Sequence, residues 1–215
     1  MIAISLRKPL LARAVCSLAA LPMLFAEIRT AFAQSYVGRN GDSESKLHDF
    51  AQRMEVAGLS SVAIAFVKGC CVDVVATTRK DKLFALYKET VAKLEQMLPR
   101  MKFVSVTVRL SVRLAGLKAR VKWLLGMLSD DNSNNRSRQA FNDLLDAEYR
   151  GNCPLFDVAA VKSTLTDGKE VTCGIGRDGF QCLAAHYATD GGSLNEARRL
   201  LVARELLFQL EEVAR

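Results

Sequence analysis

Five residues are candidates for the chemistry of ester hydrolysis: Ser43, His48, His186, Asp190 and Ser193. A serine hydroxyl barely ionises at neutral pH, so it attacks an ester only when an imidazole takes its proton and a carboxylate orients that imidazole. The chain has only two histidines, and no pattern in the sequence orients either of them toward a serine. An active site therefore requires the fold to bring His186 or His48 against Ser43.

The spacing of apolar residues predicts the elements that must position these groups. Helical periodicity predicts amphipathic helices over 44–56, 80–98, 114–128, 136–149 and 194–213. Apolar and β-branched runs predict strands over 61–67, 101–108 and 155–158. Strand, helix and strand in this order are typical of a right-handed parallel crossover, which predicts an α/β sandwich around a parallel sheet.

Two further stretches are rich in polar residues and glycine. The tract 129–135 is predicted to be a loop within one domain, and 166–179 is predicted to hold turns and a small β excursion.

The first 33 residues have the pattern of an export signal. Basic residues come first, an apolar run follows over 14–26, and a small-x-small cleavage site ends at Ala33. The run is shorter than a membrane-spanning helix requires. We expect cleavage there, a single mature domain over 34–215 and an exported protein, periplasmic or secreted; the alternative is an N-terminal segment that is not cleaved.

The cysteines outside the signal are odd in number, so at least one stays unpaired in any intramolecular scheme. Cys173 and Cys182 flank a hairpin-like segment, and we expect a local disulfide between them. Cys70 and Cys71 close an apolar strand, which favours buried packing over redox chemistry. No Cys-x-x-Cys occurs and imidazoles are scarce, so neither a metal site nor a cofactor is expected.

The net charge of +7 is concentrated in a basic region over 100–122, and no acidic residue lies between Glu95 and Asp130. Such a region can contact anionic lipid, an acidic polysaccharide or nucleic acid, or it can be a solvated face. Interleaved aromatic residues and nucleic-acid motifs are absent, so we expect no nucleic acid as partner.

The segment Asp190-Gly191-Gly192-Ser193-Leu194-Asn195, which runs into the C-terminal helix, resembles the last catalytic block of the SGNH (GDSL-type) ester hydrolases. That family carries an Asp and, three residues later, the general-base His; here Ser193 stands in place of the His. A serine hydroxyl is not basic near neutral pH and cannot carry the charge of a protonated imidazole. The substitution predicts a loss of several orders of magnitude in any triad-dependent rate.

Two upstream segments extend the resemblance. The segment 36–43 looks like the family's second block, whose glycine helps form the oxyanion hole, and its counterpart here is Gly41. Gly41-Asp42-Ser43 also spells the family's nucleophile motif, but in the family that motif ends a strand, and 37–40 does not have a strand pattern. The segment 62–73 takes the place of the third strand and block, without the Asn that supplies a second oxyanion donor.

The resemblance implies a flavodoxin-like three-layer sandwich with a parallel sheet, and it leaves the first central strand without a counterpart. It implies an impaired ester hydrolase for acyl or acetyl esters of lipids or carbohydrates, with Asp190, Ser43 and His186 as candidate catalytic residues and Gly41 as oxyanion donor. One alternative is a non-catalytic exported protein that binds an anionic glycan or membrane surface through 100–122. Another is a truncated relic whose 34–215 part folds poorly.

Overall fold

The computed structural model of the chain describes residues 2–7, 32–57, 62–112, 131–173, 180–189 and 193–214. A five-stranded sheet has the strand order β2-β1-β3-β4-β5. Its strands are β1 (Ile2–Arg7), β2 (Phe32–Tyr36), β3 (Val62–Lys68), β4 (Lys102–Val106) and β5 (Leu155–Phe156). Strands β3, β4 and β5 are parallel, while β1 is antiparallel to both of its neighbours.

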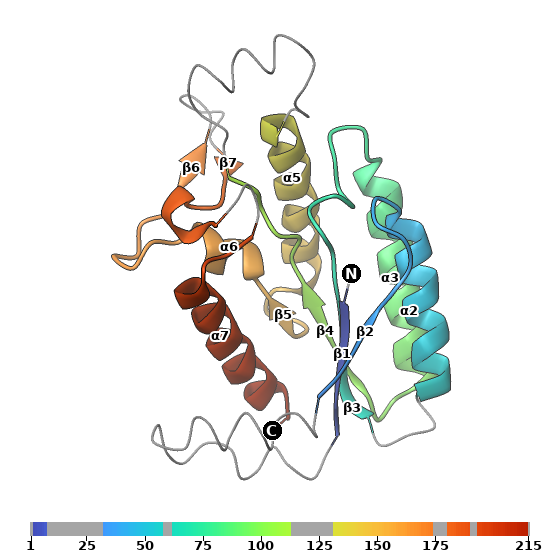
Figure 1. Cartoon of the computed structure of the whole chain (residues 1–215). Helices are drawn as coiled ribbons and strands as arrows, with labels where there is room; N and C mark the ends of the chain where they lie inside the picture. The colour runs from blue at the N-terminus through green and yellow to red at the C-terminus, as the bar shows by residue number, and fades with distance from the viewer. Residues whose placement is uncertain are drawn as a thin grey trace, which may run out of the picture.

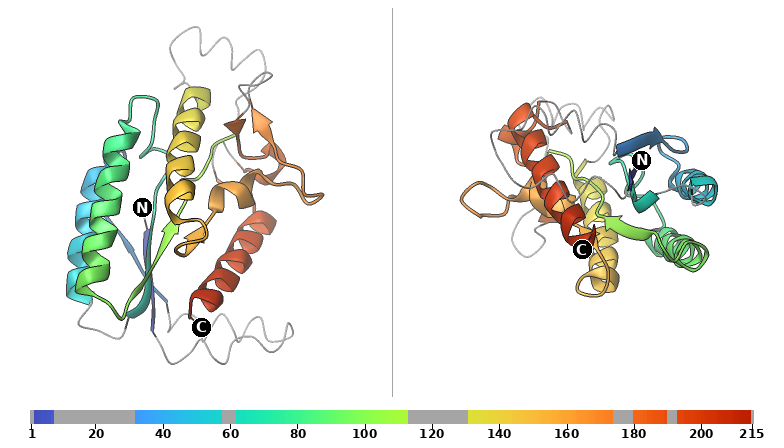
Figure 2. Two further views of the ribbon diagram at one scale, coloured as in Figure 1. Left: turned by 180° about the vertical axis from the view of Figure 1, so that it is seen from behind. Right: turned by 90° about the horizontal axis from the view of Figure 1, so that it is seen from below.

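Helices cover both faces of this sheet (Figures 1 and 2). They are α2 (Ser43–Ala57), α3 (Lys80–Met97), α5 (Asp131–Tyr149), α6 (Val158–Ser163) and α7 (Glu196–Ala214). Alternate side chains of β3 enter different cores: Ala65 and Val67 pack with α2, α3 and α5, whereas Ile64 and Phe66 pack with α6 and α7. Because both of its faces are buried, β3 reads as a continuous apolar run in the sequence.

The prediction of an α/β fold with parallel strands is confirmed. Helices α2, α3 and α7 and strands β3 and β4 lie where periodicity predicts them. The predicted helix over 114–128 lies outside the described residues, as do residues 113–122 of the basic 100–122 region. Within the described ranges, no helix combines the length and the apolar content that crossing a membrane requires.

The predicted loop over 129–135 is wrong from Asp131 on, because α5 begins there. Two asparagines of this tract are buried and bond to distant backbone. The Asn134 carboxamide oxygen accepts from the N–H of Ala76 at 2.8 Å. The Asn135 carboxamide oxygen accepts from the N–H of Ser111 at 3.0 Å, and the Asn135 amide nitrogen donates to the carbonyl oxygen of Ser111 at 2.9 Å. Asparagine favours turns when its amide bonds locally, and here tertiary partners remove that preference.

Helix α6 was not predicted, and the strand predicted over 155–158 ends at Phe156. Asp157 ends the strand by capping the helix, since its carboxylate accepts from the N–H of Ala160 at 3.0 Å. Such N-caps stabilise short helices by satisfying a free amide of the first turn.

The expected disulfide is confirmed: Cys173 and Cys182 are bonded, with their Cα atoms 5.9 Å apart. They lie at the small hairpin of β6 (Thr172–Cys173) and β7 (Phe180–Gln181), which pair antiparallel. Cys70, Cys71 and Cys153 are free thiols.

Residues 2–7, which the sequence pattern assigns to an export signal, form a strand inside the sheet. Strand β1 lies between β2 and β3, and its Ile4 is opposite both Gln34 and Phe66. The predicted cleavage site falls inside β2, so cleavage after Ala33 would remove all of β1 and the first residues of β2. Export and cleavage stay predictions.

Candidate functional site

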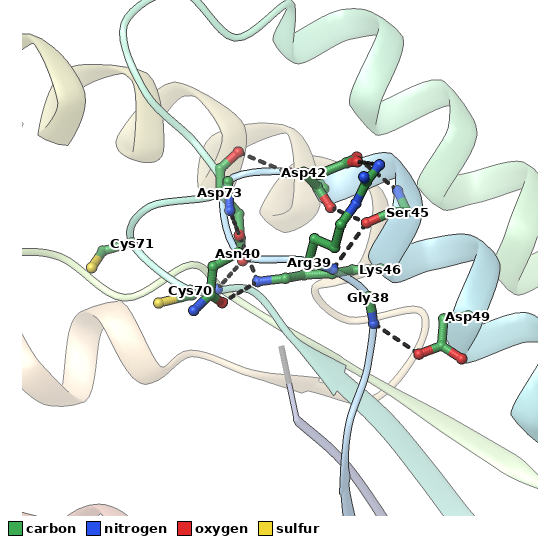
Figure 3. Close-up of polar contacts among 12 residues, drawn as sticks. Gly38, Arg39, Asn40, Asp42, Ser45, Lys46, Asp49, Cys70, Cys71 and Asp73 are labelled. Atoms are coloured by element: carbon green, nitrogen blue, oxygen red, sulfur yellow. Dashed lines mark hydrogen bonds and ion pairs between the residues drawn. The ribbon is translucent and has the colours of Figure 1, made fainter.

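The candidate site lies at the carboxyl edge of the parallel strands, where the chain leaves β3 (Figure 3). Ligands of open α/β sheets generally bind at this edge, because the loops after the strands converge there. Two groups of side chains meet in the loop 69–74: a buried ion pair and a pair of thiols beside cations.

The buried ion pair joins Lys46 of α2 to Asp73, and both side chains are 1% exposed. Lys46 Nζ lies 2.6 Å from Asp73 Oδ1 and also donates to Asn40 Oδ1 at 3.0 Å. The Asp73 carboxylate accepts from the N–H of Gly41 at 3.1 Å and from that of Cys70 at 2.6 Å. Both charged groups therefore have additional hydrogen-bond partners, as a buried ion pair requires. The pair links the loop before α2 to the loop after β3.

A glycine lets the loop before α2 run close to the helix. Gly38 has φ +54°, and a Cβ placed there would lie 2.6 Å from the backbone N and Cα of Lys46. Its N–H donates to Asp49 Oδ2 at 2.8 Å. A larger residue would therefore displace the helix turn that carries Lys46.

The geometry commits Ser43 and Gly41 to structural hydrogen bonds. Ser43 is buried at the start of α2, and its hydroxyl donates to the carbonyl oxygen of Asp73 at 2.6 Å. The N–H of Gly41, the expected oxyanion donor, donates to the Asp73 carboxylate.

Both histidines are exposed, whereas Ser43 is buried. His186 is in the 3₁₀ turn η4 (Ala185–Tyr187), where its ring centroid is 4.0 Å from that of Tyr187. Among the described residues, no hydrogen bond joins Ser43 to His186 or His48. Asp190 lies outside the described residues, and the carbonyl of Ser193 accepts from the N–H of Thr189 at 2.9 Å. The candidate triad is therefore not assembled in the part that is described.

A small cavity lies beside Ser43. Its volume is about 20 Å³, and Ser43 and Asp73 line it together with apolar side chains from β3, α3 and α5. This volume has room for about one water molecule. An acyl chain does not fit into it.

The two thiols that follow β3 contact a guanidinium that follows β4. Arg109 Nη2 lies 3.4 Å from Cys70 Sγ and 3.4 Å from Cys71 Sγ. Arg138 of α5 fixes this loop, since its Nε donates to the carbonyl of Cys71 at 2.9 Å and to that of Val74 at 3.1 Å. Both thiols are half-buried, unlike the buried packing expected for them.

In this environment the pKa values of the two thiols shift in opposite directions. The hydrogen bond from Cys71 is the main cause that lowers the pKa of Cys70 well below its usual range, and the N–H of Val72 and the charge of Arg109 add to it. The same bond, with burial, raises the pKa of Cys71 far above its usual range. These opposite shifts favour the thiolate form at Cys70 and the thiol form at Cys71.

Two lysines share this region with Arg109. Burial, followed by the charges of Arg109 and Lys68, lowers the pKa of Lys162 to about 7. Burial, and then Arg109, lowers the pKa of Lys68. Of the described ion pairs, none involves Lys68, Arg109 or Lys162. Arg109 Nε is buried and has no hydrogen-bond partner in the described part of the chain.

We call Lys68, Arg109 and Lys162 the cation cluster. Sequence reasoning assigned Arg109 to a basic surface and missed the two lysines. One signal was present: Lys68 ends β3 and Arg109 follows β4 by three residues, and neighbouring parallel strands end at the same edge. No three His, Cys, Asp or Glu side chains gather into a metal site among the described residues.

Comparisons with known proteins give no relative for this chain. No family model matches it, and no curated protein or solved structure matches it.

Proposed function

We propose that this chain is a divergent SGNH-like protein that binds an oxyanion at the cation cluster and does not hydrolyse esters through Ser43. The oxyanion is a carboxylate or sulfate group, as acidic glycans carry. The strand order, with β1 between β2 and β3, supports the flavodoxin-like part of this proposal, since that fold has the order 2-1-3-4-5. The antiparallel direction of β1 departs from it.

The observation that carries oxyanion binding is the convergence of Lys68, Arg109 and Lys162, for which the described part of the chain supplies no carboxylate partner. Like charges in a half-buried place repel one another, and the low pKa of Lys162 reflects that repulsion together with burial. The Cys70 thiolate neutralises only part of this charge. A bound oxyanion would supply the remaining negative charge and accept a hydrogen bond from Arg109 Nε.

Ester hydrolysis is tested by replacing Ser43. We expect the purified protein to turn over short-chain p-nitrophenyl esters no faster than its Ser43→Ala variant. That variant loses about 1–2 kcal/mol of unfolding free energy instead, because it leaves the carbonyl of Asp73 without its donor. Chemical denaturation measures this loss. Turnover that Ser43→Ala, His186→Ala or His48→Ala abolishes would refute this part of the proposal.

Oxyanion binding is tested with inorganic sulfate, whose own charge does not change near neutral pH. Titration calorimetry should show binding at about pH 6 that is roughly tenfold weaker at about pH 8.5, because Lys162 loses its proton near pH 7. Arg109→Met should weaken sulfate binding by about tenfold or more through the loss of charge-assisted hydrogen bonds. Lys162→Met should weaken binding at the lower pH and remove most of the pH dependence.

Lys82→Met serves as the matched control, because Lys82 is exposed on α3 and the substitution removes the same charge. We expect it to bind sulfate as the unmodified chain does. If sulfate binds equally well to the Arg109→Met and Lys82→Met proteins, the cation cluster is not the binding site.

A further inference from the structure

We propose that Cys70 and Cys71, with Arg109 in contact with both sulfur atoms, form a dithiol site that hydroperoxides oxidise reversibly. This site shares Arg109 with the cation cluster, but its chemistry is that of the thiols and does not require a bound oxyanion. Its parts come from the loop after β3 and the segment after β4.

The geometry places both sulfur atoms against one guanidinium. Arg109 donates to both, and Arg138 donates to the carbonyl of Cys71. The Cys70 N–H donates to Asp73, which is fixed by Lys46. The loop is therefore rigid at its backbone, while Figure 3 shows both sulfur atoms on the side away from the Lys46–Asp73 pair.

The first step is attack of the Cys70 thiolate on a peroxide oxygen. The S–O bond forms and the O–O bond breaks. The leaving hydroxide or alkoxide takes the electron pair of the broken bond and then a proton from water. Sulfur is oxidised by two electrons to a sulfenic acid and the peroxide is reduced, as the thiolate character of Cys70 favours. Arg109 stabilises the negative charge as it moves from sulfur to oxygen.

The second step is condensation with Cys71. Its sulfur attacks Cys70 Sγ, the S–S bond forms and the S–O bond breaks, and the hydroxyl leaves as water with the thiol proton of Cys71. Consecutive Cα atoms are about 3.8 Å apart, less than the usual distance across a disulfide, so the resulting bond is strained. Strained disulfides are easily reduced, so a thiol reductant should restore the site.

The test is peptide mass spectrometry of the full chain after treatment with one equivalent of hydrogen peroxide. We expect loss of two hydrogens from the peptide that contains Cys70 and Cys71, and recovery with dithiothreitol. In Cys71→Ser, the sulfenic acid at Cys70 should persist and be trapped by dimedone. Cys70→Ser should leave Cys71 unoxidised.

Cys153 is an internal control, since it is an exposed free thiol whose pKa is raised by burial and by nearby carboxylates. At about pH 6, iodoacetamide should alkylate Cys70 at least about tenfold faster than Cys153. Arg109→Met should reduce this preference, and Arg109→Lys should retain part of it. Equal rates for Cys70 and Cys153, or oxidation that starts at Cys71, would overturn the proposal. Sulfate binding is measured separately, so failure of one proposal leaves the other standing.

Discussion

Replacing Asp73 with alanine is expected to lower the free energy of unfolding by about 3–5 kcal/mol, because the substitution leaves the Lys46 ammonium buried without its carboxylate. Both side chains are 1% exposed, so water cannot take the place of the missing partner. The N–H groups of Gly41 and Cys70 lose their acceptor as well. Urea denaturation, followed by circular dichroism, measures the loss.

The matched control for Asp73 is Glu148→Ala. Glu148 pairs with Lys88 at 2.7 Å, but the two side chains are 39% and 43% exposed. Such surface pairs contribute about 0–1 kcal/mol, so this variant should melt close to the unmodified chain. The double variant Lys46→Met/Asp73→Ala should be more stable than the two single losses predict, since it leaves no unpaired buried charge. If Asp73→Ala costs no more than Glu148→Ala, the buried pair does not hold the two loops together.

The elements that periodicity predicts are those whose environment is uniform along their length. Helix α3 keeps one apolar stripe against the core, with Leu83, Tyr87, Val91 and Leu94 buried. Strand β3 is covered on both faces. In such elements the burial pattern repeats, so the sequence alone is enough to locate them.

The elements that were missed depend on partners far away in the chain. The start of α5 is stabilised by bonds from Asn134 and Asn135 to backbone 58 and 24 residues away. Strand β1 lies in a region whose composition is that of an export signal, and only its pairing with β2 and β3 makes it a strand. Local patterns carry no information on such long-range bonds.

In the candidate site, too, the residue types are visible in the sequence, whereas their roles depend on partners far away in the chain. Ser43 drew attention because Gly41-Asp42-Ser43 spells a nucleophile motif, but its role is decided by Asp73, 30 residues away. The adjacency of Cys70 and Cys71 is visible in the sequence. Their reactivity depends on Arg109, which lies 38 residues beyond Cys71 and reaches the thiols only because β3 and β4 are parallel neighbours.

The second large effect is expected from removing the N-terminal segment. A chain of residues 34–215 lacks β1, so the edge of β3 and the remainder of β2 lose their common neighbour. Unpaired strand edges expose backbone groups and promote association. Domains of this size are stable by only about 5–15 kcal/mol, so loss of a central strand should prevent cooperative folding. Thermal denaturation and sedimentation velocity of the two chains should show a broad, low transition and aggregates for 34–215 alone.

A point variant distinguishes the contribution of β1 to stability from that of the rest of the N-terminal segment. Ile4→Pro removes a ladder N–H in the middle of β1, whereas Ile4→Val keeps it, so only the proline variant should lower the melting temperature strongly. If Ile4→Pro and 34–215 both melt like the full chain, β1 does not stabilise the sheet, and removal of an export signal is compatible with a folded mature domain. If both unfold, the residues that resemble a signal are needed for folding, and cleavage after Ala33 would produce the poorly folding relic.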